Sequence, residues 1–336
     1  MKLFLAPLAE YTDAPFRLMC AEGGADLAYT EMVSAAALFH GSSPTRQLME
    51  TVRGEGPVAC QLFGSETDEV AFAAREAAAL RTDGAPRFCE LNLNAGCPMP
   101  RIIRSGCGAK LVTDPERVYR LLKAMADAAP DTPVTLKTRL GPRPGEDTIF
   151  ELLDAAERAG AKGIAVHARY TSQMHGGPVN LDLLAEVVAR AKIPVVGNGG
   201  VRTAADAKAM FKTGVAAVMI GRGALAEPSI FARLKAELRG EEPPAPPWSV
   251  PPVALHLERL LEFRRFLAER YPDDHVPSED AMASVKMHKH LFHYFKGRPG
   301  AGALRKRLSS IRTLAEVREA IASALTESEK PVDVAR

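Results

Sequence analysis

Eight short apolar runs recur along the first 240 residues of this 336-residue chain, with helical patterns between most of them. The runs lie at residues 3–8, 27–33, 58–63, 88–93, 134–140, 163–168, 194–198 and 217–221. They are almost continuously apolar rather than alternating, which is typical of strands that a parallel sheet buries on both faces. Eight β/α units in about 240 residues match the count and length of a TIM (β/α)8 barrel.

The competing α/β fold is a doubly wound open sheet, which normally carries a glycine-rich dinucleotide-binding turn after its first strand. Here the first run leads into Ala-Pro-Leu-Ala-Glu-Tyr-Thr-Asp, which contains no glycine. We therefore expect the closed barrel. Its helices should include residues 66–81, 114–128, 148–159 and 203–212. Ser65, Thr113 and Thr203 are good capping residues and indicate where three of these helices begin.

The chain changes character after Gly240. Residues 241–252 form a stiff proline-rich stretch, and no further run of strand type follows it. Residues 253–328 instead show helical patterns that are typical of a small bundle. The sequence thus predicts a barrel domain over residues 1–240, a linker over 241–252 and a C-terminal helical bundle domain over 253–328.

Charge is unevenly distributed in the predicted bundle, although a net charge of +2 indicates little by itself. No acid occurs between Asp280 and Glu316, while eight lysines and arginines stand among three histidines and several aromatic residues. A solvated basic face is the plain alternative, but the length and composition of the run favour contact with nucleic acid. The candidate contacts are Lys286, Lys289, Arg305 and Arg307.

Apolar residues make up 46% and charged residues 25% of the chain, which is ordinary for a soluble globular protein. No apolar run reaches the roughly 18 to 20 residues of a membrane span, and no secretory leader is present, so we expect no membrane association. Five cysteines without C-x-x-C spacing argue for a reducing compartment, which we take to be the cytoplasm. Because no ligand set at metal-binding spacing occurs, we expect no metal, and we expect a monomer.

A distinctive loop begins where the fourth apolar run ends, at Asn94-Ala-Gly-Cys-Pro. Gly96 relaxes the backbone and Pro98 fixes it, so Cys97 should stand on a sharp exit from the strand. The loop that follows is rich in arginine and lysine. Cys97 is therefore a candidate for chemistry above the sheet, with a small buried hydrophobic residue as the plain alternative.

Two glycine-rich turns, Gly197-Asn-Gly-Gly and Gly221-Arg-Gly, follow the last two apolar runs. In a TIM barrel the loops after strands seven and eight commonly hold a phosphate, which backbone N–H groups and an arginine fork suit well. Two tight βα turns would account for the glycines but less readily for Arg222. The candidate phosphate-binding residues are Asn198, Gly199, Gly200, Gly221 and Arg222.

Four polar residues, Gln61, Lys137, Arg139 and His167, interrupt apolar runs. A lysine in a barrel wall is costly to bury unless it faces an anion or an electron-rich ring. Arg139, two residues after Lys137, should point to the same side. Each residue alone is more often a satisfied core residue. Together with a phosphate site they favour a flat, polar cofactor with a phosphate tail, and FMN fits this description.

Nine short motifs occur in order between Ala6 and about Arg307. They are Ala6-Pro-Leu, Thr12-Asp-Ala-Pro-Phe-Arg, Thr30-Glu-Met-Val-Ser-Ala, Leu93-Asn-Ala-Gly-Cys-Pro, Val134-Thr-Leu-Lys-Thr-Arg-Leu-Gly, Val166-His-Ala-Arg, Gly197-Asn-Gly-Gly, Gly221-Arg-Gly and Lys289-His-Leu-Phe-His-Tyr-Phe-Lys-Gly. This series resembles the signatures of the tRNA-dihydrouridine synthases. The resemblance implies an FMN-dependent TIM barrel followed by a helical tRNA-binding domain. In that family NADPH reduces the flavin, which passes hydride to C6 of a uridine flipped out of the tRNA stack.

The resemblance also implies roles for single residues. Cys97 would be the general acid that protonates C5 of the uracil, and Asn94 would hold the uracil edge. Arg169 would reach the RNA or the flipped nucleotide, and Arg139 is a further candidate contact to the substrate. The residues expected to hold FMN are Ala6, Pro7, Leu8, Gln61, Lys137, His167, Asn198, Gly199, Gly200, Gly221 and Arg222.

The chain departs from the family pattern at three places. Tyr170 and Thr171 follow Arg169 where the family usually has a threonine and a second arginine, and Leu8 stands where a methionine is usual. Cys107 occupies a loop position that is usually small and not a thiol. It would either pair oxidatively with Cys97 or replace an alanine.

Two other interpretations stay open. An FMN barrel that reduces or oxidises a free pyrimidine, such as a dihydroorotate dehydrogenase, can also use a loop cysteine, but it has no use for a basic helical appendage. An RNA-binding protein built on an inactive barrel would keep the appendage and would not take up FMN.

Overall fold

Eight parallel strands close into a barrel in the computed structural model, which describes residues 1–328. The strands are β1 (Leu3–Leu5), β2 (Leu27–Tyr29), β4 (Val58–Phe63), β7 (Glu90–Ala95), β8 (Val134–Arg139), β9 (Ile164–His167), β10 (Val195–Asn198) and β11 (Ala217–Ile220). Each follows its neighbour in chain order, and pairing of β1 with both β2 and β11 closes the ring. Every predicted apolar run overlaps one of these strands, so the barrel prediction is confirmed. A short strand β3 (Val33–Ser34) extends the wall beside β4.

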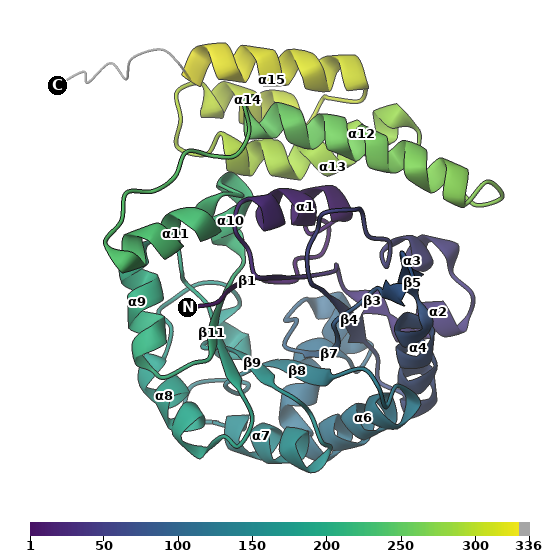
Figure 1. The fold of residues 1–336 in the computed structure, drawn as a ribbon, viewed down its shortest axis with the longest axis vertical. Coiled ribbons are helices and arrows are strands. Elements are labelled where there is room, and N and C mark those ends of the chain that lie inside the picture. Colours follow the sequence, from purple (N-terminus) through teal and green to yellow (C-terminus); the bar gives the residue numbers. More distant parts are fainter. Residues whose placement is uncertain (329–336) are drawn as a thin grey trace.

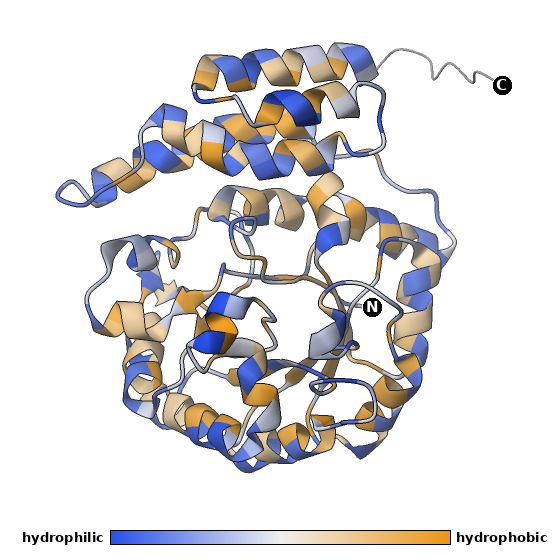
Figure 2. Cartoon of the chain, turned by 180° about the vertical axis from the view of Figure 1, so that it is seen from behind, coloured by the Kyte–Doolittle hydropathy of each residue, from blue (hydrophilic) through white to orange (hydrophobic). Residues whose placement is uncertain are grey.

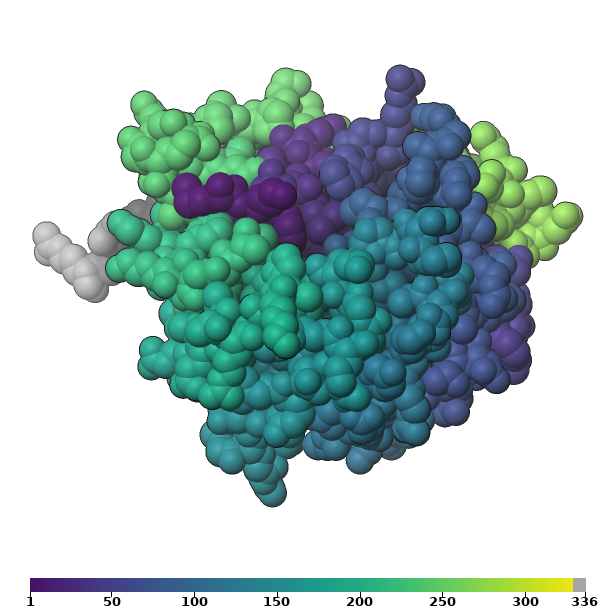
Figure 3. Space-filling view, turned by 60° about the horizontal axis from the view of Figure 1, so that its bottom comes forward, coloured from purple at the N-terminus to yellow at the C-terminus, as the bar shows by residue number. Residues whose placement is uncertain are grey.

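Helices surround the barrel (Figure 1). The longer ones are α1 (Ala14–Glu22), α4 (Thr67–Ala79), α6 (Pro115–Ala128), α7 (Ile149–Arg158), α8 (Leu181–Arg190), α9 (Ala204–Lys212) and α11 (Ile230–Arg239). Short helices α2 (Ala35–Phe39), α3 (Ser43–Gln47), α5 (Pro100–Arg104) and α10 (Arg222–Ala226), the 3-10 turns η1 (Gly108–Thr113) and η2 (Thr171–Gln173), and the hairpin β5 (Arg81–Thr82)–β6 (Ala85–Pro86) lie in the connections. In the space-filling view of Figure 3 the colours of the barrel follow the chain around this face.

Helix α6 illustrates why these segments fold as they do. Its buried residues are Val118, Leu121, Leu122 and Met125, at the i, i+3, i+4 and i+7 spacing of a single apolar stripe. The same division into hydrophobic and hydrophilic residues is visible along most helices in Figure 2. Each helix can therefore bury one face against the strands and leave the other in water.

One of the three predicted helix starts is confirmed. Thr203 caps α9 in a capping box with Asp206, in which each side chain accepts a backbone N–H of the other residue. The predictions for Thr113 and Ser65 were wrong. The carboxylate of Asp114 caps α6, since it stands directly before the proline of the first helical position. Helix α4 begins after Glu66 without a side-chain cap, and Ser65 donates its hydroxyl to that glutamate instead.

The interior of the barrel is apolar at one level and polar at the next. A small buried cluster fills the apolar level; it comprises Ala6, Leu27, Tyr29, Ala59, Ala165 and Met219. Polar side chains at the carboxyl ends of the strands replace it towards the mouth, as described below. A much larger cluster between the strands and the surrounding helices forms the main core. The barrel is thus a packed scaffold that presents one polar end.

Four helices follow the barrel and pack together beside α1 (Figure 1). They are α12 (Pro252–Arg270), α13 (Glu279–Tyr294), α14 (Ala301–Leu308) and α15 (Leu314–Ser328), and residues 241–251 before them contain no helix or strand. Their shared apolar cluster also includes Ala14 of the barrel. We refer to α12–α15 as the helical bundle. None of the helices in residues 1–328 has an apolar stretch long enough to cross a bilayer.

Candidate active site at the barrel mouth

Polar side chains lie at the carboxyl ends of the middle strands. Asn94 on β7 is the register partner of Lys137 on β8, and His167 on β9 is the partner of Asn198 on β10. Lys137 Nζ donates to Asn198 Oδ1 at 3.1 Å, although β9 separates their strands. Both side chains must therefore point into the barrel, and the predicted residues of these strands share one interior.

Cys97 stands on a turn that Asn94 holds. The Oδ1 atom of Asn94 accepts the backbone N–H groups of Gly96 at 3.1 Å and Cys97 at 3.0 Å. A Cβ atom on Gly96 would come within 3.3 Å of the Thr138 backbone, so the turn packs closely on the next strand. The carbonyl of Cys97 accepts the N–H of Ala109, which ties the returning loop to the turn. Cys97 is half-buried directly beyond the end of β7.

A chain of hydrogen bonds through the barrel interior orients Asn94. Its Nδ2 donates to Gln61 Oε1 at 2.8 Å, and Gln61 Nε2 donates to Asn92 Oδ1 at 2.7 Å. Asn92 Nδ2 in turn donates to Thr135 Oγ1 at 2.8 Å. We call these four residues the amide relay. Gln61 is fully buried and uses both ends of its amide inside the protein, so one N–H remains for any ligand.

The amide relay ends on a carboxyl group. Thr135 Oγ1 donates to Glu90 Oε1 at 3.0 Å, and the hydroxyl of Tyr29 donates to the same oxygen at 2.7 Å. Burial raises the pKa of Glu90, although the hydrogen bonds from Tyr29 and Thr135 oppose that shift. Sequence reasoning missed Asn92, Thr135 and Glu90, because the sequence does not show which residues form hydrogen bonds with a polar side chain inside an apolar run. Asn92, two residues before Asn94 and therefore on the same face, was the available signal.

Positive charge gathers at the mouth. The group consists of Lys137, Arg139, Arg169, Arg202 and Arg222 together with His167 and His175, whose pKa values are lowered so that the imidazoles are uncharged at neutral pH; we call it the cationic cluster. Burial, and then the charge of Arg139, lower the pKa of Lys137 to about 7. Burial and then the neighbouring arginines lower the pKa of His175 to about 4. In the described part of the chain no carboxylate is among the main causes of these shifts. The mouth is therefore electrostatically prepared for an anion.

Arg139 is buried and its guanidinium is used inside the protein. Its Nε donates to the backbone carbonyl of Gly96 at 2.7 Å. Its Nη1 donates to the backbone carbonyls of Tyr170 at 3.1 Å and Met174 at 2.7 Å. The side chain thus braces the turn before Cys97 against the loop after β9. This internal role follows from the contacts, and the contact of Arg139 with a substrate stays a prediction.

Arg169 and Arg222 hold the same loop from its other side. Arg169 donates to the carbonyl of Gly177 through Nε at 3.0 Å and Nη2 at 2.9 Å, and its Nη1 lies 3.1 Å from His167 Nε2. Arg222 Nη2 donates to the carbonyl of His175 at 2.7 Å. Sequence reasoning missed His175 and Arg202, which lie in loops without any periodic pattern.

The two glycines of the β10 turn are favoured for different reasons, close packing at Gly199 and a positive φ of +78° at Gly200. Gly199 has a φ of +123°, and a Cβ atom there would lie 2.8 Å from the Cδ2 atom of His167. At Gly200 a Cβ atom would lie 3.7 Å from Arg169 Nη2. The backbone therefore passes directly over two members of the cationic cluster, where its N–H groups and the side chains can act on one ligand.

The first and last strands of the barrel meet at a neighbouring edge of the mouth. A Cβ atom on Gly221 would lie 3.6 Å from both Ala6 Cβ and Leu8 Cδ2. Pro7 and Leu8 are half-buried, and Ala6 belongs to the interior cluster. The structure thus brings the predicted apolar residues beside the predicted phosphate-binding loops.

The thiols near the mouth differ in their surroundings. Burial raises the pKa of Cys97, although a backbone hydrogen bond and the charges of Arg139 and Lys137 oppose that shift. Cys97 is therefore a protonated thiol at neutral pH. Cys107 is buried and its Sγ lies 3.4 Å from the carbonyl oxygen of Ser105. All five cysteines are free.

Three cations in the basic run of the helical bundle are paired with acids from other elements. Lys286 Nζ lies 3.0 Å from Glu31 Oε1, Lys289 pairs with Glu10, and Arg307 pairs with Glu319 at 2.7 Å. Arg305 is exposed and lies over the ring of Phe292 at 5.3 Å. Of the four predicted contacts, Arg305 is thus the one without an ion pair in residues 1–328, and RNA contact by these residues stays a prediction.

Known proteins are similar to this chain in sequence and in fold. The family model "Dihydrouridine synthase (Dus)" matches residues 4–330. A probable tRNA-dihydrouridine synthase of Treponema pallidum is 40% identical over 69% of this chain and 70% of its own length. The tRNA-dihydrouridine synthase B of Pseudomonas putida is 32% identical over 92% of this chain and 87% of its own length.

A solved structure supports the fold. Morphinone reductase in complex with tetrahydroNAD superimposes with a TM-score of 0.51 at 14% sequence identity, over 70% of this chain and 86% of that protein. At this identity the likeness concerns the barrel alone. The motifs around Cys97, the barrel that positions them and the sequence matches over nearly the whole length agree, and this chain belongs to the dihydrouridine synthase family.

Proposed function

We propose that this protein reduces a uridine of tRNA to 5,6-dihydrouridine, with FMN as the bound redox cofactor and NADPH as the source of electrons. Family membership supports the reaction and the relatives named for tRNA support the substrate. The observation that carries the proposal is the position of the Cys97 thiol, which Asn94 holds at the barrel mouth beside the cationic cluster and whose pKa burial raises. A proton donor and a site for an anionic cofactor are the two requirements of this reduction.

The residues of the mouth fit FMN. The cationic cluster lacks a carboxylate partner in the described residues, and the glycine turn after β10 brings backbone N–H groups over it. These features suit the phosphate, which we assign to Gly199, Gly200 and Arg222. Lys137 suits an electron-rich ring edge. Its pKa is lowered because its ammonium group is buried beside Arg139 without a negatively charged partner. Gln61 has one N–H left for the same edge, and Ala6, Pro7 and Leu8 offer an apolar surface.

FMN, when bound, would supply the hydride that goes to C6 of the uracil. The Sγ–H bond of Cys97 breaks and its proton goes to C5, so that the C5–C6 double bond becomes single. Cys97 is left as a thiolate, and the positive charges of Lys137 and Arg139 stabilise it until water returns a proton.

Asn94 would position the uracil with its remaining N–H. One hydrogen of Nδ2 is bound by Gln61, and the other points to the sulfur of Met32 at 3.0 Å, which is a weak acceptor. A carbonyl oxygen of the uracil is a stronger acceptor and would replace that sulfur. Because the other end of the same amide holds Cys97, the pyrimidine and the thiol would be positioned by one side chain.

The helical bundle would bind the folded tRNA while the target base lies in the barrel. The base has to leave its stack to reach the thiol, and a separate surface is needed to hold the rest of the RNA. We assign this surface to exposed cations for which no ion pair is found in residues 1–328, namely Lys296, Arg298, Arg305 and Lys306. Lys286 and Lys289 would instead help to hold the bundle on the barrel. A cytoplasmic location, where tRNA is modified, belongs to the same proposal.

The test uses the full chain with FMN, NADPH and an unmodified tRNA transcript, and it measures dihydrouridine by nucleoside mass spectrometry. We expect product that requires all three additions. In Cys97→Ala the rate should fall by about 10²- to 10⁴-fold, the usual contribution of a general acid, while reduction of the bound flavin by NADPH continues. Cys107→Ala is the matched control and should retain the rate. Turnover of a free pyrimidine such as orotate without any product on tRNA would overturn the proposal.

A further inference from the structure

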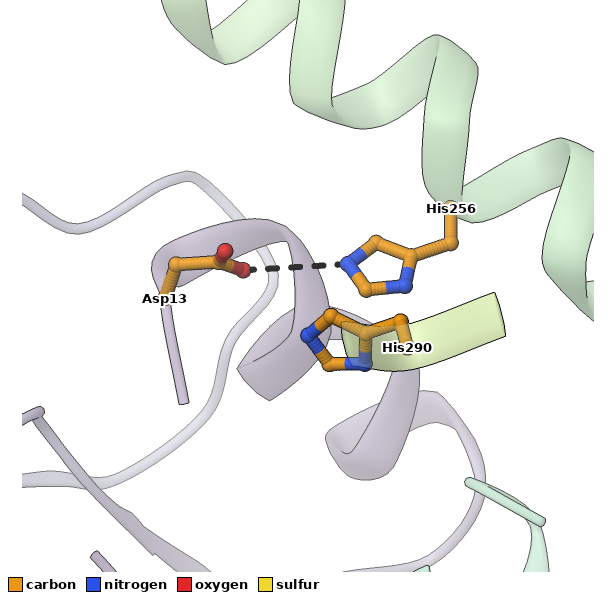
Figure 4. A group of neighbouring side chains, drawn as sticks. All are labelled: Asp13, His256 and His290. Carbon is orange, nitrogen blue, oxygen red and sulfur yellow. Dashed lines mark ion pairs between the residues drawn. The ribbon is translucent and has the colours of Figure 1, made fainter. Parts of the chain in front are cut away.

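Three side chains that could bind a metal meet where the helical bundle joins the barrel (Figure 4). Asp13 precedes α1, His256 lies on α12 and His290 lies on α13. Asp13 is 7% exposed and both histidines are 0% exposed. The Nε2 atom of His256 is 3.8 Å from Asp13 Oδ1, and one ligand atom from each residue lies within 4.8 Å of the others. None of the three belongs to the cationic cluster or to the turn of Cys97.

Most of the polar atoms in this group have no hydrogen-bond partner. They are Asp13 Oδ2, His256 Nε2 and both ring nitrogens of His290, among the residues that the structure describes. A buried polar atom without a partner is destabilising and rare in folded proteins, so three adjacent side chains in this state are an unusual concentration. A charged contact between His256 Nε2 and Asp13 Oδ1 engages one of these atoms but leaves Asp13 Oδ2 and both nitrogens of His290 without a partner. A metal ion that binds the free lone pairs would give these atoms a partner.

The remaining polar atoms are arranged like the outer contacts of a metal centre. Nδ1 of His256 lies 3.3 Å from the hydroxyl of Tyr294, and the tautomer in which Nδ1–H donates to that hydroxyl has its lone pair on Nε2. Oδ1 of Asp13 accepts the backbone N–H of Phe16 at 3.1 Å, which fixes the carboxylate at the start of α1. Partners that orient both a histidine and a carboxylate from outside are usual for metal ligands.

We propose that Asp13, His256 and His290 bind one divalent transition-metal ion of the zinc class. Two imidazoles and one carboxylate suit zinc and its neighbours, whereas calcium and magnesium prefer oxygen ligands alone. With bonds of about 2.0–2.1 Å, tetrahedral ligands lie about 3.3 Å apart. The 3.8 Å between His256 Nε2 and Asp13 Oδ1 has to close by about 0.5 Å, and the other separations, which are at most 4.8 Å, by at most about 1.5 Å. A water molecule would be the fourth ligand.

Charge and access permit an ion at this place. The cations nearby, Arg17 and Lys286, are already paired with Glu55 and Glu31, so they do not compete for the carboxylate of Asp13. Asp13 also lines a cavity of about 130 Å³ at the junction of barrel and bundle, which offers a path for the ion. The ion would connect α1, α12 and α13, and its function would be to fix the bundle on the barrel. The inference is independent of the proposed reaction.

The test is a metal analysis of the untagged full-length protein. The protein is stripped with a chelator, supplied with Zn²⁺, passed through a desalting column and measured by mass spectrometry for bound metal. We expect about one zinc per chain, and a melting temperature that rises with the zinc concentration. Asp13→Asn and His290→Gln should lower the bound zinc about ten-fold or more. With Co²⁺ in place of Zn²⁺, the wild-type protein should show the visible absorption of a tetrahedral site.

Two histidines serve as matched controls. His275 is exposed in the loop between α12 and α13, and His288 lies on α13 but outside the group. His275→Ala and His288→Ala should bind as much zinc as the wild type. Wild-type protein that retains no zinc would overturn the proposal even if the variants fail to fold. Zinc that survives in Asp13→Asn and His290→Gln but is lost in either control would place the ion elsewhere and overturn it as well.

Discussion

Replacement of Asn92 by alanine should affect stability and activity through the amide relay. Asn92 is fully buried, accepts from Gln61 Nε2 at 2.7 Å and donates to Thr135 Oγ1 at 2.8 Å. Alanine removes both hydrogen bonds and leaves one N–H of Gln61 without a partner in the barrel interior. It also removes the contact that keeps the amide of Gln61 directed towards Asn94.

The size of the effect follows from these contacts. Two lost hydrogen bonds contribute about 1 kcal/mol each, and the unpaired N–H of Gln61 adds about 1–2 kcal/mol, so the free energy of unfolding should fall by about 3–4 kcal/mol. Activity should fall as well, because a loose Gln61 no longer fixes Asn94 and Asn94 places Cys97. A displacement of about 1 Å at a reacting group costs up to about 10²-fold, so we expect kcat to fall by about 10- to 100-fold.

Thr135→Val separates the two effects. It breaks the relay on the far side of Asn92 and also removes the hydroxyl bonded to Glu90, but it leaves the contacts of Gln61 with Asn92 and Asn94 intact. Its stability should fall by about 2–3 kcal/mol while kcat stays within about three-fold of the wild type. Urea unfolding gives the first quantity, and dihydrouridine formation at a temperature where both variants are folded gives the second. If Thr135→Val lowers kcat as much as Asn92→Ala does, the relay does not act through Gln61 and the reasoning fails.

Two further predictions concern the charged groups. Burial and the charge of Arg139 lower the pKa of Lys137 to about 7, so binding of FMN should raise that pKa, and the protein should take up a proton at pH values between about 7 and the raised pKa. Calorimetry in buffers of different ionisation enthalpy should detect this proton uptake in the wild type but not in Lys137→Met. An equal uptake in both proteins would contradict the assignment. The variant Arg305→Ala/Lys306→Ala should bind tRNA more weakly and with a salt dependence that is lower by about 0.7–0.9 per lost phosphate contact, measured by fluorescence anisotropy at several salt concentrations. Lys286→Ala should instead lower the stability of the fold, because it leaves Glu31 buried and unpaired. If the salt dependence of tRNA binding changed in Lys286→Ala alone, our assignment of the RNA surface would be wrong.

The architecture could be predicted from the sequence because its main determinant is local. A strand buried on both faces is mostly apolar, so the runs that overlap β4 and β11 can be recognised without knowing their neighbours. Cys97 was recognisable for a related reason, since a glycine and a proline beside it interrupt such a run. Helix starts were less certain, because the choice between Thr113 and Asp114 depends on one side chain at the junction.

The partners of charged residues could not be predicted, because they depend on the fold. Lys286 and Glu31 are 255 residues apart in the chain and 3.0 Å apart in space. The run without acids was real in the sequence, but acids from loops at the barrel mouth and from α15 pair with three of its cations. The same reason explains why no metal was expected: ligands that come from three separate elements leave no spacing to find.

Ala14 has a consequence for how such enzymes can be altered. Its side chain belongs to the barrel's first helix but packs inside the apolar cluster of the bundle, and the ring of the nearby Phe16 lies 5.0 Å from that of His290. A bundle exchanged with that of a relative would therefore meet a foreign surface on α1 and would dock badly, unless α1 were exchanged with it. New preferences for a target nucleotide should thus be easier to obtain by changing exposed side chains than by recombining whole modules.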